Sequence, residues 1–239
     1  MARIIDFIFP IAPLPKDNKQ RDAVIKGYGI FVRKDTKDYA KGLLFELLLL
    51  WGGVYSISHA YSTINISTFV CMLLPTLLYI VSLVLFICCK FMRSTDVEHA
   101  KQTISLLCSF VLCISFINIF LGFLNYDSWK NNKYIELDLH TYLFIFGISA
   151  FAYYVGYRIF YKGFNNRMEK QQHNHANIIG FEILGGTVSY LFLRNITNNI
   201  FLLIFFPGVL FIVFVSTWSL VNYRQYDNIQ RAKKGMIYK

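Results

Sequence analysis

The sequence is poor in charged residues, and its charges are unequal in sign. Only 16% of the 239 residues are Asp, Glu, Lys or Arg, whereas a soluble domain carries about 25%. Acids are the scarcer kind, with 14 Asp and Glu against 24 Lys and Arg, and 55% of the residues are hydrophobic. This composition excludes a disordered chain and an ordinary soluble enzyme.

Signatures of catalysis and of nucleotide binding are also missing. The sequence has no H-E-x-x-H zinc helix, no G-x-S-x-G nucleophile elbow and no Walker A or G-x-G-x-x-G loop. Its five histidines lack the spacing of metal ligands, and its five cysteines lie in or beside two apolar segments, without the pattern of a disulfide framework. We therefore expect a protein that is not an enzyme and that holds no metal or cofactor.

What the sequence does contain is six apolar segments that are long enough to cross a bilayer, which takes roughly 17–25 residues per helix. They cover residues 42–62, 68–89, 103–124, 139–161, 178–193 and 200–222. The fifth is the shortest and holds three glycines, so a re-entrant segment is the alternative there. We predict an all-α integral membrane protein, a bundle of six transmembrane helices with very short external loops.

The distribution of Lys and Arg predicts which side faces the cytoplasm. If all six segments span, the segments 1–41, 90–102, 158–177 and 223–239 lie on one side and hold 21 of the 24 basic residues. The positive-inside rule places these segments, and with them both termini, in the cytoplasm. Omitting the fifth span would move the basic tail to the opposite side. The net charge of +10 is thus an orientation signal, and we expect no binding to nucleic acid.

The chain divides into three parts, without an internal repeat or a long linker. Residues 1–41 form a cytoplasmic or interfacial segment, residues 42–222 the transmembrane domain, and residues 223–239 a basic cytoplasmic tail. The apolar residues 4–9 are expected in the membrane interface or against the bundle. Asp35 is a candidate N-cap from which a helix runs into the first span. Because the external loops are so short, recognition is expected within the bilayer, at its surfaces or on the cytoplasmic face.

Two acids, Glu46 and Glu182, lie inside the predicted spans, where an ionised group is costly. Both spans enter from the cytoplasm and each glutamate lies about four residues in, so the two share a depth. Arg158, in the last turns of the fourth span, returns to that level and can pair with Glu182. One interpretation is a site that handles protons or cations on the cytoplasmic side. The other is that both carboxylates reach the interface or fix helix packing by pairing.

Small residues and prolines indicate where helices touch and bend. Pro75 and Pro207-Gly208 are expected to kink the second and sixth spans and to free carbonyls that the protein must satisfy. Such kinks suit a gated bundle as well as a static one. Small residues also recur at spacings that let two helices approach closely; these are Ala152 with Gly156, Gly52-Gly53 with Ser56, and Gly185-Gly186.

Two functions fit these features. The first is a non-enzymatic protein of the cytoplasmic (inner) membrane that oligomerises and docks a cytoplasmic protein partner. Membrane components of bacterial immunity, exclusion and defence modules have this layout, and the richness in Phe, Tyr and Asn favours a bacterium or a mobile element. The alternative is an ion channel or a permease subunit with a polar site at Glu182. Its layout is similar to that of ABC-2-type permeases, which also have six spans, cytoplasmic termini and an interfacial segment before the first span.

Overall fold

The computed structural model describes residues 7–10, 36–60, 66–92, 94–130, 139–165, 185–188, 190–194 and 197–233. Within these ranges the regular structure is helical throughout, as predicted. The short stretches 185–188 and 190–193 are helical as well. The five long helices, in chain order, are α3 (Thr36–Ala60), α4 (Ile66–Cys88), α5 (Ser94–Lys130), α6 (Leu139–Asn165) and α8 (Ile200–Lys233).

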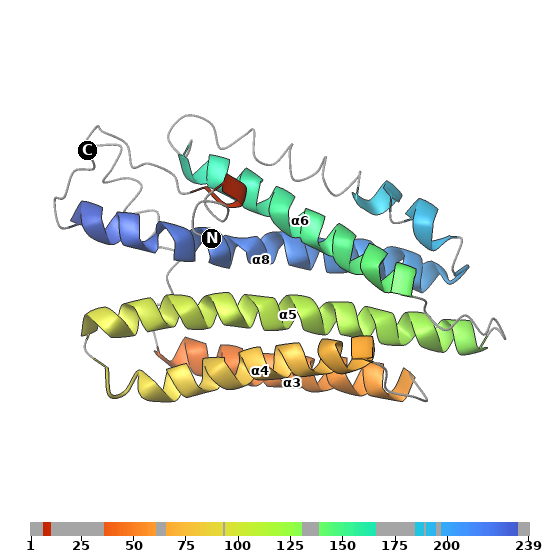
Figure 1. Ribbon diagram of the computed structural model, residues 1–239, viewed down its shortest axis with the longest axis horizontal. Coiled ribbons are helices and arrows are strands. Elements are labelled where there is room, and N and C mark those ends of the chain that lie inside the picture. Colours follow the sequence, from red (N-terminus) through yellow and green to blue (C-terminus); the bar gives the residue numbers. More distant parts are fainter. Residues whose placement is uncertain are drawn as a thin grey trace.

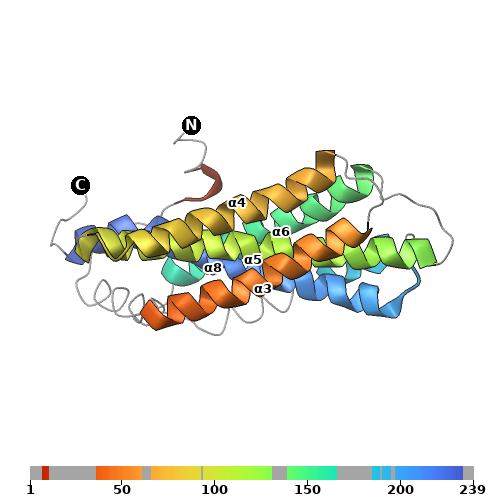
Figure 2. The ribbon, with the colours of Figure 1, turned by 90° about the horizontal axis from the view of Figure 1, so that it is seen from below.

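The long helices lie side by side with α5 in the middle (Figure 1). On one side α5 packs against α3 and α4, and on the other side it packs against α8, which in turn packs against α6. The view from below shows the same arrangement, with α4 and α3 in front of the other helices (Figure 2). The bundle therefore has two interfaces that share one helix: the α3–α4–α5 interface and the α5–α6–α8 interface.

Five helices are long and apolar enough to cross a membrane. Their candidate spans are Tyr39–His59, Thr68–Cys88, Val97–Asp127, His140–Tyr161 and Ile200–Tyr226. This fits the predicted multi-pass membrane protein. Of the predicted fifth segment, 178–193, residues 178–184 and 189 lie outside the described residues.

The long helices extend beyond the apolar segments from which they were predicted. α3 begins at Thr36, directly after the candidate N-cap, and α5 runs from Ser94 to Lys130 rather than over 103–124. α8 continues to Lys233, eleven residues past the predicted end of the last span. The reason is that hydropathy marks where a helix enters lipid, whereas a helix ends only where its backbone hydrogen bonds end.

α3 buries one narrow stripe and exposes the rest of its surface. The buried residues recur every three or four positions, the spacing of a close helix–helix contact; they are Tyr39, Leu43, Glu46, Leu50, Gly53 and Ile57. The opposite face carries exposed apolar side chains such as Leu44, Leu48 and Trp51. α4 exposes a similar apolar stripe, which includes Leu73, Leu77 and Val84. Apolar surface of this extent suits contact with lipid.

Candidate functional site

Glycines on both helices allow α3 and α5 to pack closely. A Cβ atom placed on Gly53 would lie 3.0 Å from the Ser115 carbonyl oxygen of α5, and one on Gly122 would lie 2.7 Å from the Ser56 Cβ of α3. The two backbones approach closely because no side chain stands between them at these positions. Of the predicted small residues, Gly53 and Ser56 therefore lie in this contact, whereas the nearest atom to a Cβ on Gly52 is Ile119 Cδ1 at 3.9 Å.

Pro75 leaves a backbone acceptor in α4 that α5 satisfies. A proline has no N–H, so the residue at position 75 cannot bond to the carbonyl of Cys71 one turn earlier. The side-chain amide of Asn118, which is fully buried, donates to that carbonyl oxygen at 2.8 Å. In the lipid interior, where no water is present, the donor for this carbonyl has to come from the protein. The gap made by the proline thus becomes a specific contact between α4 and α5.

Glu46 lies in the α3–α4–α5 interface. It is 8% exposed and stands in the buried stripe of α3 between Leu43 and Leu50. Tyr79 of α4 donates its hydroxyl to the Leu43 carbonyl of α3 at 3.2 Å, about one turn before Glu46. The carboxyl group of Glu46 is therefore next to α4 and α5. α6, which carries Arg158, lies on the far side of α5 (Figure 1).

Arg158 lies in the last turns of α6, with its guanidinium 5.9 Å from the ring centre of Tyr154. This is a cation–π contact within one helix, four residues apart. Glu182, its predicted partner, lies outside the described residues, so an ion pair between the two stays a prediction. Of the two glutamates that are expected at one depth, the structure therefore describes only Glu46.

Gly156 marks the closest approach of α6 to α8. A Cβ atom on Gly156 would lie 2.7 Å from the Phe214 carbonyl oxygen and 2.9 Å from Thr217 Oγ1. Ala152, one turn earlier, is 1% exposed and belongs to the main hydrophobic core. For Gly185 the nearest atom is Leu210 Cδ1 at 3.9 Å, and Gly186 has nothing within 4 Å.

Pro207 lies inside α8, and the helix continues through it to Lys233. Gly208 next to it is exposed, and a Cβ atom on this glycine would have no neighbour within 4 Å. Pro75 is likewise inside α4. Both prolines thus lie within helices that continue past them.

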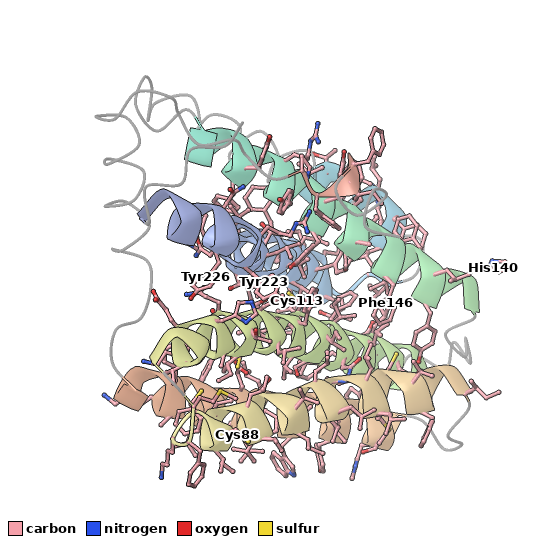
Figure 3. The ribbon with its side chains drawn as sticks, turned by 60° about the vertical axis from the view of Figure 1, so that its left-hand side comes forward. Cys88, Cys113, His140, Phe146, Tyr223 and Tyr226 are labelled. Carbon is pink, nitrogen blue, oxygen red and sulfur yellow. The ribbon has the colours of Figure 1, made fainter. Side chains whose placement is uncertain are left out.

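Polar groups of all three helices also lie in the α5–α6–α8 interface. The Cys113 thiol of α5 and the Ser216 hydroxyl of α8 are 2.7 Å apart, and Cys113 faces α8 in Figure 3. Tyr153 of α6 stacks its ring on Phe110 of α5 at 5.5 Å. At one end of α8, Tyr223 and Tyr226 contact the ring of His99 (Figure 3). Hydrogen-bonding groups are therefore distributed along one half of this interface.

A second polar group links the end of α5 to the start of α8. Asp127, 9% exposed, accepts hydrogen bonds from the Thr197 hydroxyl and from the Asn199 amide, the latter at 2.9 Å. Asn199 also caps α8, because its side-chain oxygen accepts from the Phe201 N–H at 3.0 Å. An Asn directly before an apolar run is a helix-start signal, so Asn199 was open to prediction. Its pairing with Asp127 was not.

The N-terminal stretch 7–10 contacts both α6 and α8. Tyr157 of α6, which is fully buried, donates its hydroxyl to the Pro10 carbonyl at 2.6 Å. Arg224 of α8 donates to the Phe9 carbonyl at 3.0 Å. Figure 1 shows this short red segment beside α6. Phe9 and Pro10 thus pack against the bundle, whereas Phe7 and Ile8 are exposed. Of the apolar residues expected in the interface or against the bundle, Ile4 and Ile5 lie outside the described residues.

Polar contacts within the described residues therefore lie beside Glu46, at the Cys71 carbonyl, along the α5–α6–α8 interface, at Asp127, and where α6 and α8 bind residues 9 and 10. No group of three His, Cys, Asp or Glu side chains in the described ranges is arranged to hold a metal ion. The cysteines, all of which are described, are free thiols. No protein-family model matches the chain, and no curated protein or solved structure is similar to it.

Proposed function

We propose that the chain is a non-enzymatic, six-span protein of the cytoplasmic membrane, with both termini in the cytoplasm, that docks a protein partner on its cytoplasmic face. Five candidate spans support the membrane assignment. The sixth span is supported by the distribution of basic residues and by residues 190–193, in which Phe192 stacks on Phe144 of α6 with ring centres 3.4 Å apart. A small membrane component of a bacterial immunity, exclusion or defence module would have this layout.

The observation that carries this proposal is the length of α8. Its 34 residues extend about 51 Å, whereas the hydrocarbon core of a bilayer is about 30 Å thick. The apolar run begins at the first residue of α8, and the candidate span ends at Tyr226. The surplus therefore emerges at the C-terminal end, where the sequence carries Arg231 and Lys233. A basic helix that projects from the membrane surface offers a docking element for an acidic protein surface.

Oligomerisation belongs to the same proposal. Gly147 of α6 and Gly208 of α8 are exposed and have no neighbour within 4 Å. Glycines on a lipid-facing helix let a second helix approach closely. Native mass spectrometry of the protein extracted in a mild detergent gives the number of subunits directly, and a monomer at all concentrations would remove this part of the proposal.

Co-purification from cells after cross-linking tests the docking function. We expect one protein to be recovered in fixed ratio with the wild type and to be lost when Arg231, Lys233 and Lys234 are replaced by Glu. A matched control replaces Lys130, Lys133 and Arg194, which lie on the predicted external side, by Glu. Equal recovery of the partner with both triple variants would contradict docking at the α8 end, and so would its loss with the control alone.

A channel or permease subunit is the second candidate, because polar groups lie inside the α5–α6–α8 interface. A path for an ion or a substrate through this interface would pass the contact of Cys113 with Ser216 and the stacked ring of Tyr153. Reconstitution in liposomes with measurement of ion flux separates the two functions. Flux that falls with Glu182→Gln would favour transport with a site on the cytoplasmic side. Absence of flux from folded, inserted protein would leave docking as the function.

A further inference from the structure

The stretch Phe7–Pro10 is held by two helices through consecutive carbonyl groups. Tyr157 of α6 binds the Pro10 carbonyl and Arg224 of α8 binds the Phe9 carbonyl. The ring of Phe9 meets Tyr157 and Tyr154 edge-on, with centroid distances of 4.9 Å and 6.4 Å. We call Tyr154, Tyr157 and Arg224 the Phe9–Pro10 site.

The chemistry of this site matches a peptide segment in which an aromatic residue precedes proline. The hydroxyl of Tyr157 and the guanidinium of Arg224 both donate hydrogen bonds here, so the ligand must supply acceptors. Two adjacent main-chain carbonyls do so, and proline brings no N–H that would be buried without an acceptor. Edge-to-face packing of the aromatic ring adds stabilisation beyond simple burial. Recognition thus uses the backbone, one ring and one proline.

We propose that the Phe9–Pro10 site is a peptide-binding site, and that the chain's own N-terminal segment occupies it as a latch between α6 and α8. The segment that occupies the site in the structure belongs to the same chain, so the chain's own N-terminal segment is the ligand that we assign to it. Because the segment and the site belong to one chain, the binding step is intramolecular and needs no second molecule. This inference requires no partner protein and stands apart from the docking function.

Photo-cross-linking in the full-length protein tests the occupancy. Benzoylphenylalanine replaces Phe9 in the membrane-embedded protein, and after irradiation the adduct is mapped by mass spectrometry. We expect a cross-link to the α6 peptide that contains Tyr154 and Tyr157, within a single chain. The same label at position 7, whose native side chain is 83% exposed, is the matched control. Equal labelling from both positions, or an adduct found only between two chains, would overturn the latch.

Substitutions in the site test whether the hydrogen bonds of Tyr157 and Arg224 hold the segment in place. Tyr157→Phe removes the donor to Pro10, and losing about 1 kcal/mol corresponds to an approximately fivefold lower ratio of closed to open latch. Arg224→Gln, which removes a charged donor, is expected to lower that ratio by about tenfold. Tyr55→Phe, at a side chain of α3 that is 48% exposed, serves as the control. A Phe9 cross-linking yield that is unchanged in both Tyr157→Phe and Arg224→Gln, in protein that elutes as the wild type, would overturn the proposal.

A free peptide tests the class of ligand. The octapeptide of residues 5–12, with benzoylphenylalanine in place of Phe9, is offered to the full-length wild type and to full-length Phe9→Ala, in which the tethered ligand is weakened. We expect the peptide to label α6 several times more strongly in Phe9→Ala. A peptide of the same composition with the aromatic residue and the proline exchanged is the control. Equal labelling by the two peptides would show that the site does not read the aromatic–proline order.

Discussion

The two interfaces of α5 are formed by different kinds of contact. In the α3–α4–α5 interface, Gly53 and Gly122 bring backbones together, and the Asn118 amide fills the gap left by Pro75. In the α5–α6–α8 interface a core of mainly aliphatic and aromatic side chains also contains hydroxyl, thiol and carboxyl groups, and Gly156 gives a close backbone approach between α6 and α8. Backbone contacts tolerate no added atoms, whereas hydrogen bonds between side chains can be exchanged for others. The first interface is therefore expected to be rigid, and the second to be the one that can rearrange.

The largest expected effect tests the rigid interface. Gly122→Leu places a side chain where a Cβ alone would lie 2.7 Å from Ser56, so α3 and α5 must separate. We expect a loss of about 3 kcal/mol in stability, the upper part of the usual range for overpacking. The measurement is the midpoint of thermal unfolding in detergent, followed by size-exclusion chromatography. Gly186→Leu is the control, because a Cβ atom on Gly186 would have nothing within 4 Å; equal midpoints for the two variants would contradict the rigid contact.

The next largest loss of stability is expected at the carbonyl freed by Pro75, and a second substitution should reverse it. Asn118→Leu leaves the Cys71 carbonyl without its donor, and we expect a loss of about 1–2 kcal/mol. Adding Pro75→Ala restores an N–H one turn after Cys71, so the double variant should regain most of that stability. A double-mutant cycle of thermal midpoints measures the coupling. Additive effects of the two substitutions would show that Asn118 does not repair the proline gap.

The smallest effect is expected in the rearrangeable interface. Asp127→Asn retains one acceptor oxygen but removes the charge and one acceptor, so Thr197 and Asn199 compete for the oxygen that remains. Because these groups can turn to other partners, we expect a loss of about 1 kcal/mol, the value of a single hydrogen bond. The thermal midpoint measures it, with Asn198→Ser on the exposed neighbour as control. A loss as large as that of Gly122→Leu would erase the distinction between the interfaces.

The candidate residues were predictable to different degrees. Gly156 and Ala152 follow from a local spacing, and the structure places Gly156 against α8. The freed carbonyl at Pro75 follows from the chemistry of proline, but the donor does not, because Asn118 lies 47 residues away from Cys71. Glu46 was recognisable as a costly acid in a span, yet its neighbours Tyr79 and Leu43 depend on how α4 packs against α3.

Local sequence was enough to predict the long apolar helices that the described residues form, because hydropathy and helix formation depend on neighbouring residues. Of the glycines that the sequence singles out, Gly53 and Gly156 lie in close helix contacts, whereas a Cβ atom on Gly186 would meet nothing within 4 Å. Only the tertiary structure decided that Asp127 bonds to Thr197 and Asn199, and that Arg224 binds the carbonyl of Phe9, 215 residues earlier. Pairings of this kind leave no periodic pattern in the chain, since they arise from the relative placement of whole helices.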